Sequence, residues 1–580
     1  MKRLPKQLTI ILLITLCLAG CEEFLEDEIQ TLKTEEVIDF REQSRGLIND
    51  IYSDYAFNYF SDFSIEYLTD NAVNRSSPQH LATGFWGPTD NPFGNLWKRS
   101  YNNIRQVVQY IEEVHNTGLP FKPAAQDSLE NVRTLRRYFG EAHFLKAFAE
   151  WELLRIYSGP SAATGDMLGF PIINSILASG DYTTLSRASF EQCVDRVMMD
   201  LDTAIQYLPL IYSGKGNSNP GYSVIETGRA SGLAAHALKA KVALLAASPA
   251  FNPTNDVSKW ERAAQLAHEL IIQNGGLKTL QPYDFRREDN PDHIWRLRLF
   301  RQNNSLERRL YPPTLFGQGE VNPSQNLVDA FPAVNGYPIS AVESGFDPDN
   351  PYANRDPRFN RFIFFNGDHC FDNSSGCQNY DTLEIFEGGR DYFGGFIPNV
   401  GTRTGYYLKR FLNDLDFDPS VNDAVTNLPK VYVQLGLTEM YLTYAEAANE
   451  AYGQPNTIPP GMTFSAREAL AFVRQRAGIS PDPYLDAVAL STDDFRELVR
   501  NERRIELSFS GERFHDLRRW RIIDTMDNVR GMKILRNDNN TFSHEEISVE
   551  DRVFDAKNYY LPLPYEELLL NTNLEQNQGW

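Results

Sequence analysis

Two glutamates four residues apart, Glu502 and Glu506, have the spacing that best fits a catalytic pair in this chain. Residues four apart on a helix lie about 6 Å from each other at Cβ, close to the carboxylate separation of retaining glycosidases. The surrounding segment, 495–509, has apolar residues at helical spacing, and both glutamates fall within the apolar stripe. An acid pair for glycoside hydrolysis is therefore one interpretation.

The same segment is rich in arginine, which favours a structural role for the two glutamates. Buried carboxylates need counter-ions, and nearby guanidinium groups lower a carboxyl pKa, whereas a general acid needs a raised one. Gly511 ends the helix, so the residues after it can fold back. We therefore predict a buried ion-pair network and no enzyme activity. Its predicted members are Glu502, Glu506, Arg503 and Arg513, with Arg500, Arg504, Arg518 and Arg519 as further candidates.

The composition indicates an acidic globular protein. The 580-residue chain is 42% hydrophobic and 12% aromatic, which is enough to form a large core. Its net charge of −21 argues against a nucleic-acid partner, because phosphate binding needs a cationic face. The sequence contains neither a GxSxG motif nor a phosphate-binding loop, so we expect no nucleophilic catalysis and no cofactor.

The N-terminus has the pattern of a lipoprotein signal peptide. Three basic residues precede an apolar run at 8–18, which is too short for a membrane span of about 20 residues. Cys21 follows Leu-Ala-Gly, which resembles a lipobox, and an acidic stretch comes next. We predict that residues 1–20 are removed, that Cys21 is acylated and that residues 21–40 form a tether. The alternative is ordinary signal cleavage with Cys21 incidental.

Two further cysteines, Cys370 and Cys377, lie close together in a predicted loop. In an exported protein this spacing permits a disulfide. We expect no metal site at the pair, because His369 is the only other soft ligand nearby and no second cysteine pair follows.

Helical periodicity dominates two parts of the chain, 41–274 and 430–524. Between them, the stretch 275–429 is rich in glycine, proline, asparagine and aromatic residues, which predicts a long irregular insert. The tail, 525–580, has the pattern of an extended segment. The sequence thus predicts one mostly α domain, 41–580. Helices are predicted at 43–57, 93–115, 128–157, 189–208, 228–248, 257–274, 431–452, 464–477 and 494–509.

Aromatic side chains are in excess in the loop sequences, and flat rings can stack on the apolar faces of sugars. Trp86 is the foremost candidate, because glycines and prolines hold it in a loop shortly after three polar residues that could bind hydroxyl groups. Tyr392 could form a second wall. The alternative for each ring is burial in the core. The predicted ligand residues are Trp86, Asp70, Asn71, Arg75, Tyr392, Tyr337 and Trp295.

Six segments, spread over the whole chain, together resemble the SusD/RagB family of nutrient-binding lipoproteins. The most specific is ERRIELSFSGERFHDLRRW. The others are CEEFLEDE, FLKAFAEWELLRIYSG, GRASGLAAHALKAKVALLAASP, LTEMYLTYAEAANE and YYLPLPYEELLLNTNLEQNQGW.

The resemblance implies a scaffold of TPR-like helical pairs, the SusD-like fold, with the loop-rich insert forming the ligand face. It places that face where the loop 70–86 meets the loops 281–311 and 337–393. It also implies a lipid-anchored protein on the outer-membrane surface that binds an oligo- or polysaccharide and delivers it to a SusC-type TonB-dependent transporter. RagB-like relatives imply peptide as an alternative cargo.

Two other functions remain open on the sequence alone. A surface glycosidase would use the glutamate pair, and an adhesive surface protein would bind no soluble glycan or peptide. Seven arginines between 286 and 309 could favour an anionic glycan, although pairing with the acidic residues of the same stretch is the favoured interpretation.

Overall fold

The structure is a computed structural model in which a defined set of residues can be described. These are residues 40–56, 61–76, 82, 86–115, 129–214, 219, 221–284, 287, 289–298, 305–369, 382–395, 397–412 and 431–580. The predicted acylation of Cys21 and the predicted disulfide between Cys370 and Cys377 fall outside these residues.

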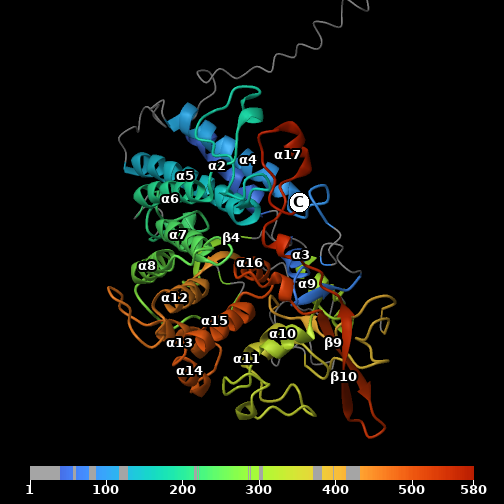
Figure 1. Ribbon diagram of the computed structural model, residues 1–580. Coiled ribbons are helices and arrows are strands. Elements are labelled where there is room, and N and C mark those ends of the chain that lie inside the picture. Colours follow the sequence, from blue (N-terminus) through green and yellow to red (C-terminus); the bar gives the residue numbers. More distant parts are fainter. Residues whose placement is uncertain are drawn as a thin grey trace, which may run out of the picture.

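The fold is mostly α, as predicted, and its long helices descend as a curved stack along one side of the molecule (Figure 1). Successive helices pack on one another, from α5 on α6 through α7 and α8 to α12 and α13. The helices are α2 (Phe40–Ala56), α4 (Gly94–Gln109, continued by a π-helical turn at Tyr110–His115), α5 (Leu129–Tyr157), α6 (Phe190–Tyr207), α7 (Gly232–Ala247), α8 (Val257–Gln273), α12 (Leu437–Tyr452), α13 (Ala466–Arg476), α14 (Pro483–Val488), α15 (Thr492–Glu506) and α16 (Glu512–Arg519).

Helix α7 shows how composition determines this stack. Its alanines let α6, α8 and α12 approach closely, because interaxial distance depends on the side chains at the contact. The helix begins at Ser231, whose hydroxyl accepts a hydrogen bond from the backbone N–H of Ala234, and it ends before Pro249. Lys241 is a buried cation within this small, apolar helix.

Five antiparallel two-stranded sheets and several short helices make up much of the remaining described chain. The sheets pair β1 (Ala72–Asn74) with β5 (Val321–Pro323), β2 (Gly159–Pro160) with β3 (Met167–Leu168), β4 (His293–Arg298) with β8 (Val431–Gly436), β6 (Ile363–Phe364) with β7 (Tyr407–Leu408), and β9 (Val529–Arg536) with β10 (Phe542–Glu550). The short α-helices are α3 (Ser61–Glu66), α9 (Ser305–Leu310), α10 (Gln325–Ala330), α11 (Pro357–Phe362) and α17 (Tyr565–Leu570). The 3-10 turns are Asp181–Thr184, Val224–Glu226, Pro313–Leu315, Val342–Ser344, Ile523–Thr525 and Ala556–Tyr559.

Two predicted boundaries are wrong. Residues 431–436 form strand β8 instead of the first turns of a helix, because Val431 and Leu435 alternate into the core while the backbone pairs with β4. Helix α12 begins only after Gly436. The tail is not simply extended, since it forms the β9–β10 hairpin and helix α17.

The molecule has two hydrophobic cores, and α15 lies between them. Phe495 and Val499 belong to the core of the helical stack. Ile505 and Phe509 belong to a second core, built mainly from loop and short-helix residues between 306 and 412. The corner at the end of α15 therefore joins the stack to the loop-rich half of the molecule.

Candidate functional site

The two glutamates of α15 lie on its buried face, next to the second core. Glu502 is fully buried, and its carboxylate accepts hydrogen bonds from Arg358 at 2.7 Å and from Arg474 at 2.5 Å. Glu506 contacts the same Arg358 guanidinium at 2.8 Å and Arg476 at 2.6 Å. All four carboxylate oxygens therefore have a cationic partner.

Arg358 is the centre of this network. It lies in α11, whose first turn is capped by Asp356 through a 2.8 Å bond from the Arg358 backbone N–H. The Asp356 carboxylate also pairs with the Arg358 guanidinium at 2.6 Å. One arginine of the loop-rich half thus binds three buried carboxylates and ties that half to α15.

The prediction that Arg503 and Arg513 pair with the two glutamates of α15 is wrong. Arg503 pairs with Asp516 at 2.9 Å, and Arg513 pairs with Asp70 at 3.1 Å. Position 503 is adjacent to Glu502 on the helix and therefore lies about 100° around the axis, where it faces α16 and α12 instead of α11 and α13. The partners of Glu502 and Glu506 come from segments remote in sequence.

The charge environment is unsuited to an acid pair. Burial raises the pKa of Glu502, but the guanidinium groups of Arg358 and Arg474 outweigh it and lower that pKa to about 2. A carboxyl group with this pKa stays ionised at neutral pH and cannot donate a proton as a general acid.

Trp86 is covered, contrary to its prediction as an exposed stacking platform. Its side chain is only 7% exposed, and its ring lies 5.0 Å from the ring of Trp580, centroid to centroid. Trp580 is in turn fixed by a 2.9 Å bond from its indole N–H to the Tyr560 carbonyl. The C-terminal residue thus occupies the face that a sugar would need.

Asp70 and Asn71 are engaged inside the protein. Burial raises the pKa of Asp70, but Arg504 and Arg513 lower it to about 2, with Arg504 2.9 Å from the carboxylate. Asn71 donates to Glu66 at 2.6 Å and accepts from Arg504 at 2.7 Å. Their polar groups bind neighbouring segments and are not presented to a ligand.

Trp295 is a core residue, so its assignment to the ligand site is wrong. It is 1% exposed, and its ring makes edge contacts with Phe144 and Phe148 at about 5 Å between centroids. Its indole N–H donates to the Gly228 carbonyl at 3.1 Å. Strand β4 alternates about the pleat, and this position points into the helical stack.

The remaining predicted residues are partly exposed. Arg75 donates to the Gln318 carbonyl at 2.6 Å, and the backbone of Tyr392 forms an isolated parallel β-bridge with that of Thr402. Arg403 brings their two loops together by donating to the Asn74 carbonyl at 3.0 Å. Tyr337 lies elsewhere, with its ring 5.2 Å from that of Tyr484 at α14. The predicted residues therefore do not form one continuous surface.

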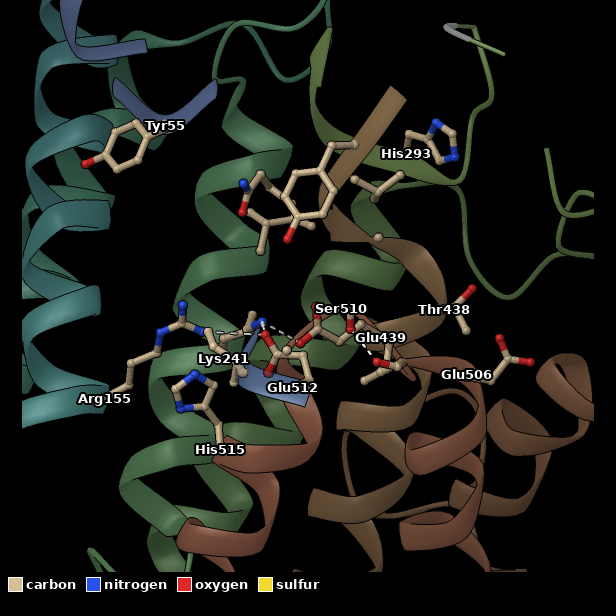
Figure 2. A pocket seen from close by; sticks show the side chains of 18 of the residues that line it. Tyr55, Arg155, Lys241, His293, Thr438, Glu439, Glu506, Ser510, Glu512 and His515 are labelled. Carbon is tan, nitrogen blue, oxygen red and sulfur yellow. Dashed lines mark hydrogen bonds and ion pairs between the residues drawn. The ribbon is translucent and has the colours of Figure 1, made fainter. Parts of the chain in front are cut away.

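A cavity of about 440 Å³ lies where the helical stack meets the loop-rich half. Helices α4, α5 and α7 form one side, and residues 281–284 and 290–293, strand β8, the start of α12 and the turn between α15 and α16 form the other. Its volume is within the usual range for small-molecule sites. Figure 2 shows side chains from both sides directed into this space.

Lys241 is the central charge of the cavity floor (Figure 2). Its ammonium group bridges Glu439 at 2.6 Å and Glu512 at 2.9 Å, and Arg155 lies 3.5 Å from Glu512. Burial raises the pKa of Glu512, but Lys241 and Arg155 lower it to about 2. The floor is thus a set of fixed charges that hold α5, α7, α12 and α16 together.

Several buried polar atoms at the cavity have no hydrogen-bond partner within the described residues. They are Oη of Tyr55, Oε2 of Glu152, Oδ1 of Asp292, Nδ1 of His293 and of His515, and Nε of Arg99, Arg155, Arg410 and Arg476. Native proteins rarely leave buried polar groups unpaired, because each costs about 1–3 kcal/mol. A concentration of them around one cavity indicates that the groups completing these bonds come from a ligand or solvent.

Aromatic rings line the same cavity and supply apolar surface. Tyr55, Phe93, Phe148, Trp151, Tyr283 and Tyr432 contribute to its walls. The sequence pattern did not predict the charged floor. The one available signal was Lys241 itself, a lysine in an otherwise small and apolar helix.

The described part of the chain lacks two kinds of feature. None of its helices is long and apolar enough to cross a bilayer. Nor does that part bring three or more histidine, cysteine, aspartate or glutamate side chains together in a way that could hold a metal ion.

Two family sequence models match successive parts of the chain. The one described as "SusD family" matches residues 285–580, and the one described as "Starch-binding associating with outer membrane" matches residues 23–244. The first match alone covers about half of the chain and includes the α15–α16 corner.

Similar proteins span nearly the whole length. SusD-like protein P38 of Formosa agariphila is 23% identical over 522 residues, covering 88% of this chain and 86% of that protein. SusD-like protein P25 of the same bacterium is 22% identical over 605 residues, covering 98% of this chain and 97% of its own.

Solved structures share the fold. A SusD-like protein of Bacteroides fragilis matches with a TM-score of 0.69 and 23% identity, covering 91% of this chain and 96% of its own. A laminarin-binding SusD-like protein matches with a TM-score of 0.57 and 17% identity, covering 93% and 99%.

Proposed function

The chain belongs to the SusD family, and we propose that it is an outer-membrane lipoprotein that binds an oligo- or polysaccharide and delivers it to a SusC-type TonB-dependent transporter. The observation that carries the proposal is the match of two family models to successive parts of the chain, one of them described by starch binding and outer-membrane association. Binding of laminarin by a structural neighbour supports glycan as the cargo.

The cavity adds physical support for a saccharide ligand. Sugars present hydroxyl groups that both donate and accept hydrogen bonds, and C–H faces that pack on aromatic rings. The cavity offers both kinds of partner, unpaired polar atoms and aromatic walls. The protein acts here as a binding module and not as an enzyme, because Arg358 and Arg474 keep the Glu502 carboxylate ionised and so unable to act as a general acid.

Peptide is the second candidate cargo. The binding energy of a peptide in an extended groove comes mainly from backbone hydrogen bonds at an exposed strand edge. Isothermal titration calorimetry of the purified protein with neutral oligosaccharides, acidic oligosaccharides and short peptides separates the two. We expect a neutral oligosaccharide to bind, and binding by peptides alone would replace the proposed cargo.

The membrane anchor is tested separately. Cys21→Ala removes the thiol that acylation needs, so the protein should appear in the soluble fraction after cell lysis without detergent. Ser76→Ala, at an exposed position in the folded domain, is the matched control and should remain with the membranes. A Cys21→Ala protein that stays fully membrane-associated would rule out the lipid anchor.

The transporter partner is tested by affinity purification from detergent-solubilised outer membranes. The expected result is co-purification of a TonB-dependent barrel with the wild-type protein. Recovery of the protein without any barrel at detergent concentrations that preserve other outer-membrane complexes would contradict the delivery role while leaving glycan binding intact.

A further inference from the structure

The cavity beside α7 has a distribution of charge and hydrogen-bonding groups that distinguishes between classes of cargo. From this we infer that it is a subsite for the end of an uncharged glycan chain, and that it excludes glycans carrying carboxylate or sulfate groups at that end. The inference rests on the proposed function and narrows it to one ligand class at one place.

The cations that line the cavity are engaged within the protein. Four of the five contact a carboxylate and Arg410 contacts backbone carbonyls, so their charges are offset before a ligand arrives. The contacts are Arg99 with Glu152 at 2.9 Å, Arg155 with Glu512 at 3.5 Å, Lys241 with Glu439 at 2.6 Å, Arg476 with Glu506 at 2.6 Å, and Arg410 with the Ser508 carbonyl at 2.7 Å. The N–H groups that remain unpaired within the described residues can each donate to a hydroxyl oxygen, and they are Nε of Arg99, Arg155, Arg410 and Arg476.

The carboxylates that line the cavity outnumber those cations. Asp292 is buried, and one of its oxygens accepts the Gln281 backbone N–H at 2.5 Å while the other has no partner. Glu152 likewise has one oxygen on Arg99 and one unpaired. These free acceptors attract a hydroxyl hydrogen and repel an anion, because Coulomb repulsion is strong away from bulk water.

His515 is only 8% exposed, and its Nδ1 has no hydrogen-bond partner among the described residues. Burial, reinforced by Arg155, Arg518 and Lys241, lowers the pKa of His515 well below its usual value, so the ring is neutral. A neutral imidazole has one donor and one acceptor nitrogen. This mixed capacity matches a hydroxyl group, which also donates and accepts.

The size of the cavity and its exposed edge determine how much of a glycan it can hold. A cavity of about 440 Å³ holds a chain end and not a polymer. Ser64, Pro92 and Asn95 line it and are exposed, so a longer glycan can continue into solvent at that edge. Phe93 and Trp151 supply the apolar wall on the inner side.

The experiment compares Asp292→Ala with the matched control Asp289→Ala. Asp289 lies three residues away in the same segment, but its side chain is exposed and it is not part of the cavity. Calorimetry is performed with hexasaccharides of β-1,3-glucose, α-1,4-glucose and β-1,4-mannose, with hexagalacturonate, and with trialanine. His515→Leu is the second variant, because Nδ1 of His515 has no hydrogen-bond partner within the described chain and the loss of the ring should leave folding intact.

We expect at least one neutral hexasaccharide to bind the wild type and Asp289→Ala equally. Asp292→Ala and His515→Leu should each bind it about tenfold more weakly, since a hydrogen bond to a charged or buried group is lost. Unchanged affinity in both folded variants would show that the glycan does not bind in the cavity, and the proposed function would still stand. Binding of hexagalacturonate as tightly as the neutral glycan would overturn the ligand class, and binding of trialanine alone would overturn the function as well.

Discussion

The ion-paired corner of α15 and the neighbouring cavity are both lined by buried charges, but the protein satisfies them to different extents. At the corner, Arg358 alone contacts three carboxylates, and Glu502 and Glu506 have a cation on every oxygen. At the cavity, Asp292 and His515 each keep an unpaired polar atom. The two regions share Glu506, which belongs to the corner network and also lines the cavity.

Buried polar groups therefore have two different roles in this protein, one in stability and one in binding. A network in which every carboxylate oxygen has a cationic partner stabilises one arrangement of its segments, because removing any member leaves an uncompensated charge. A partly paired site is less favourable for the free protein and acquires its missing bonds from a ligand. Substitutions at the corner should therefore change stability, and substitutions at the cavity should change affinity.

The largest expected effect is that of Arg358→Met. It leaves three buried carboxylates without their shared cation and should lower the free energy of unfolding by about 5 kcal/mol, at the upper end of values for broken buried pairs. Chemical denaturation measures this loss. The control is Arg467→Ala, which breaks an exposed pair with Asp486 and should cost at most about 1 kcal/mol. Equal stability of the two variants would show that the network is not needed for folding.

Trp86→Ala tests whether the Trp86 ring is part of the core or stacks on a bound ligand. Truncating a covered tryptophan should lower the free energy of unfolding by about 3–4 kcal/mol, while the affinity of the folded protein for a neutral hexasaccharide stays unchanged. Tyr392→Ala, which alters a partly exposed ring, serves as the comparison. A thirtyfold loss of affinity in Trp86→Ala would return Trp86 to the ligand site and require that Trp580 move aside.

Glu502→Gln should lower the free energy of unfolding by about 3 kcal/mol at pH 7, and the difference from wild type should depend on pH. The pKa of Glu502 is about 2 in the folded state and near 4.3 in the unfolded state. Its stabilisation is therefore present above about pH 4.3 and is lost as pH falls toward 2. Urea denaturation of both proteins between pH 7 and pH 3 should show that the difference in their free energies of unfolding becomes smaller. A difference that stays constant would contradict the lowered pKa of Glu502.

The smallest expected effect concerns pH and ligand affinity. Burial lowers the pKa of His515 well below its usual value and that of His293 to about 4. Neither ring should gain a proton between pH 8 and pH 6, so the affinity for a neutral hexasaccharide should change by less than about twofold. Calorimetry at pH 6, 7 and 8 checks this. A loss of binding centred near pH 6.5 would mean that one of the two histidines titrates in the open cavity.

Local patterns predicted most of the helical stack, because helix formation depends on spacing and capping within one segment. The helices predicted at 189–208 and 257–274 are α6 and α8, and Ser189 caps α6 by accepting a hydrogen bond from the Gln192 backbone N–H. The same reasoning failed at Val431, where the alternation of a paired strand runs directly into a helix. It also failed at Trp295, because the sequence around this residue resembles a loop and does not show that strand β4 pairs with strand β8.

The sequence by itself determined the family, the mostly α class and the burial of two glutamates on one helical face, since each depends on residue order within a segment. Only the tertiary structure decided the partners of those glutamates. Glu502 is 144 residues from Arg358, and no local spacing relates them. The cavity was likewise unpredictable, because Lys241, Asp292 and His515 come from three separate elements. Which polar atoms stay unpaired depends on how those elements pack, and packing is a property of the whole chain.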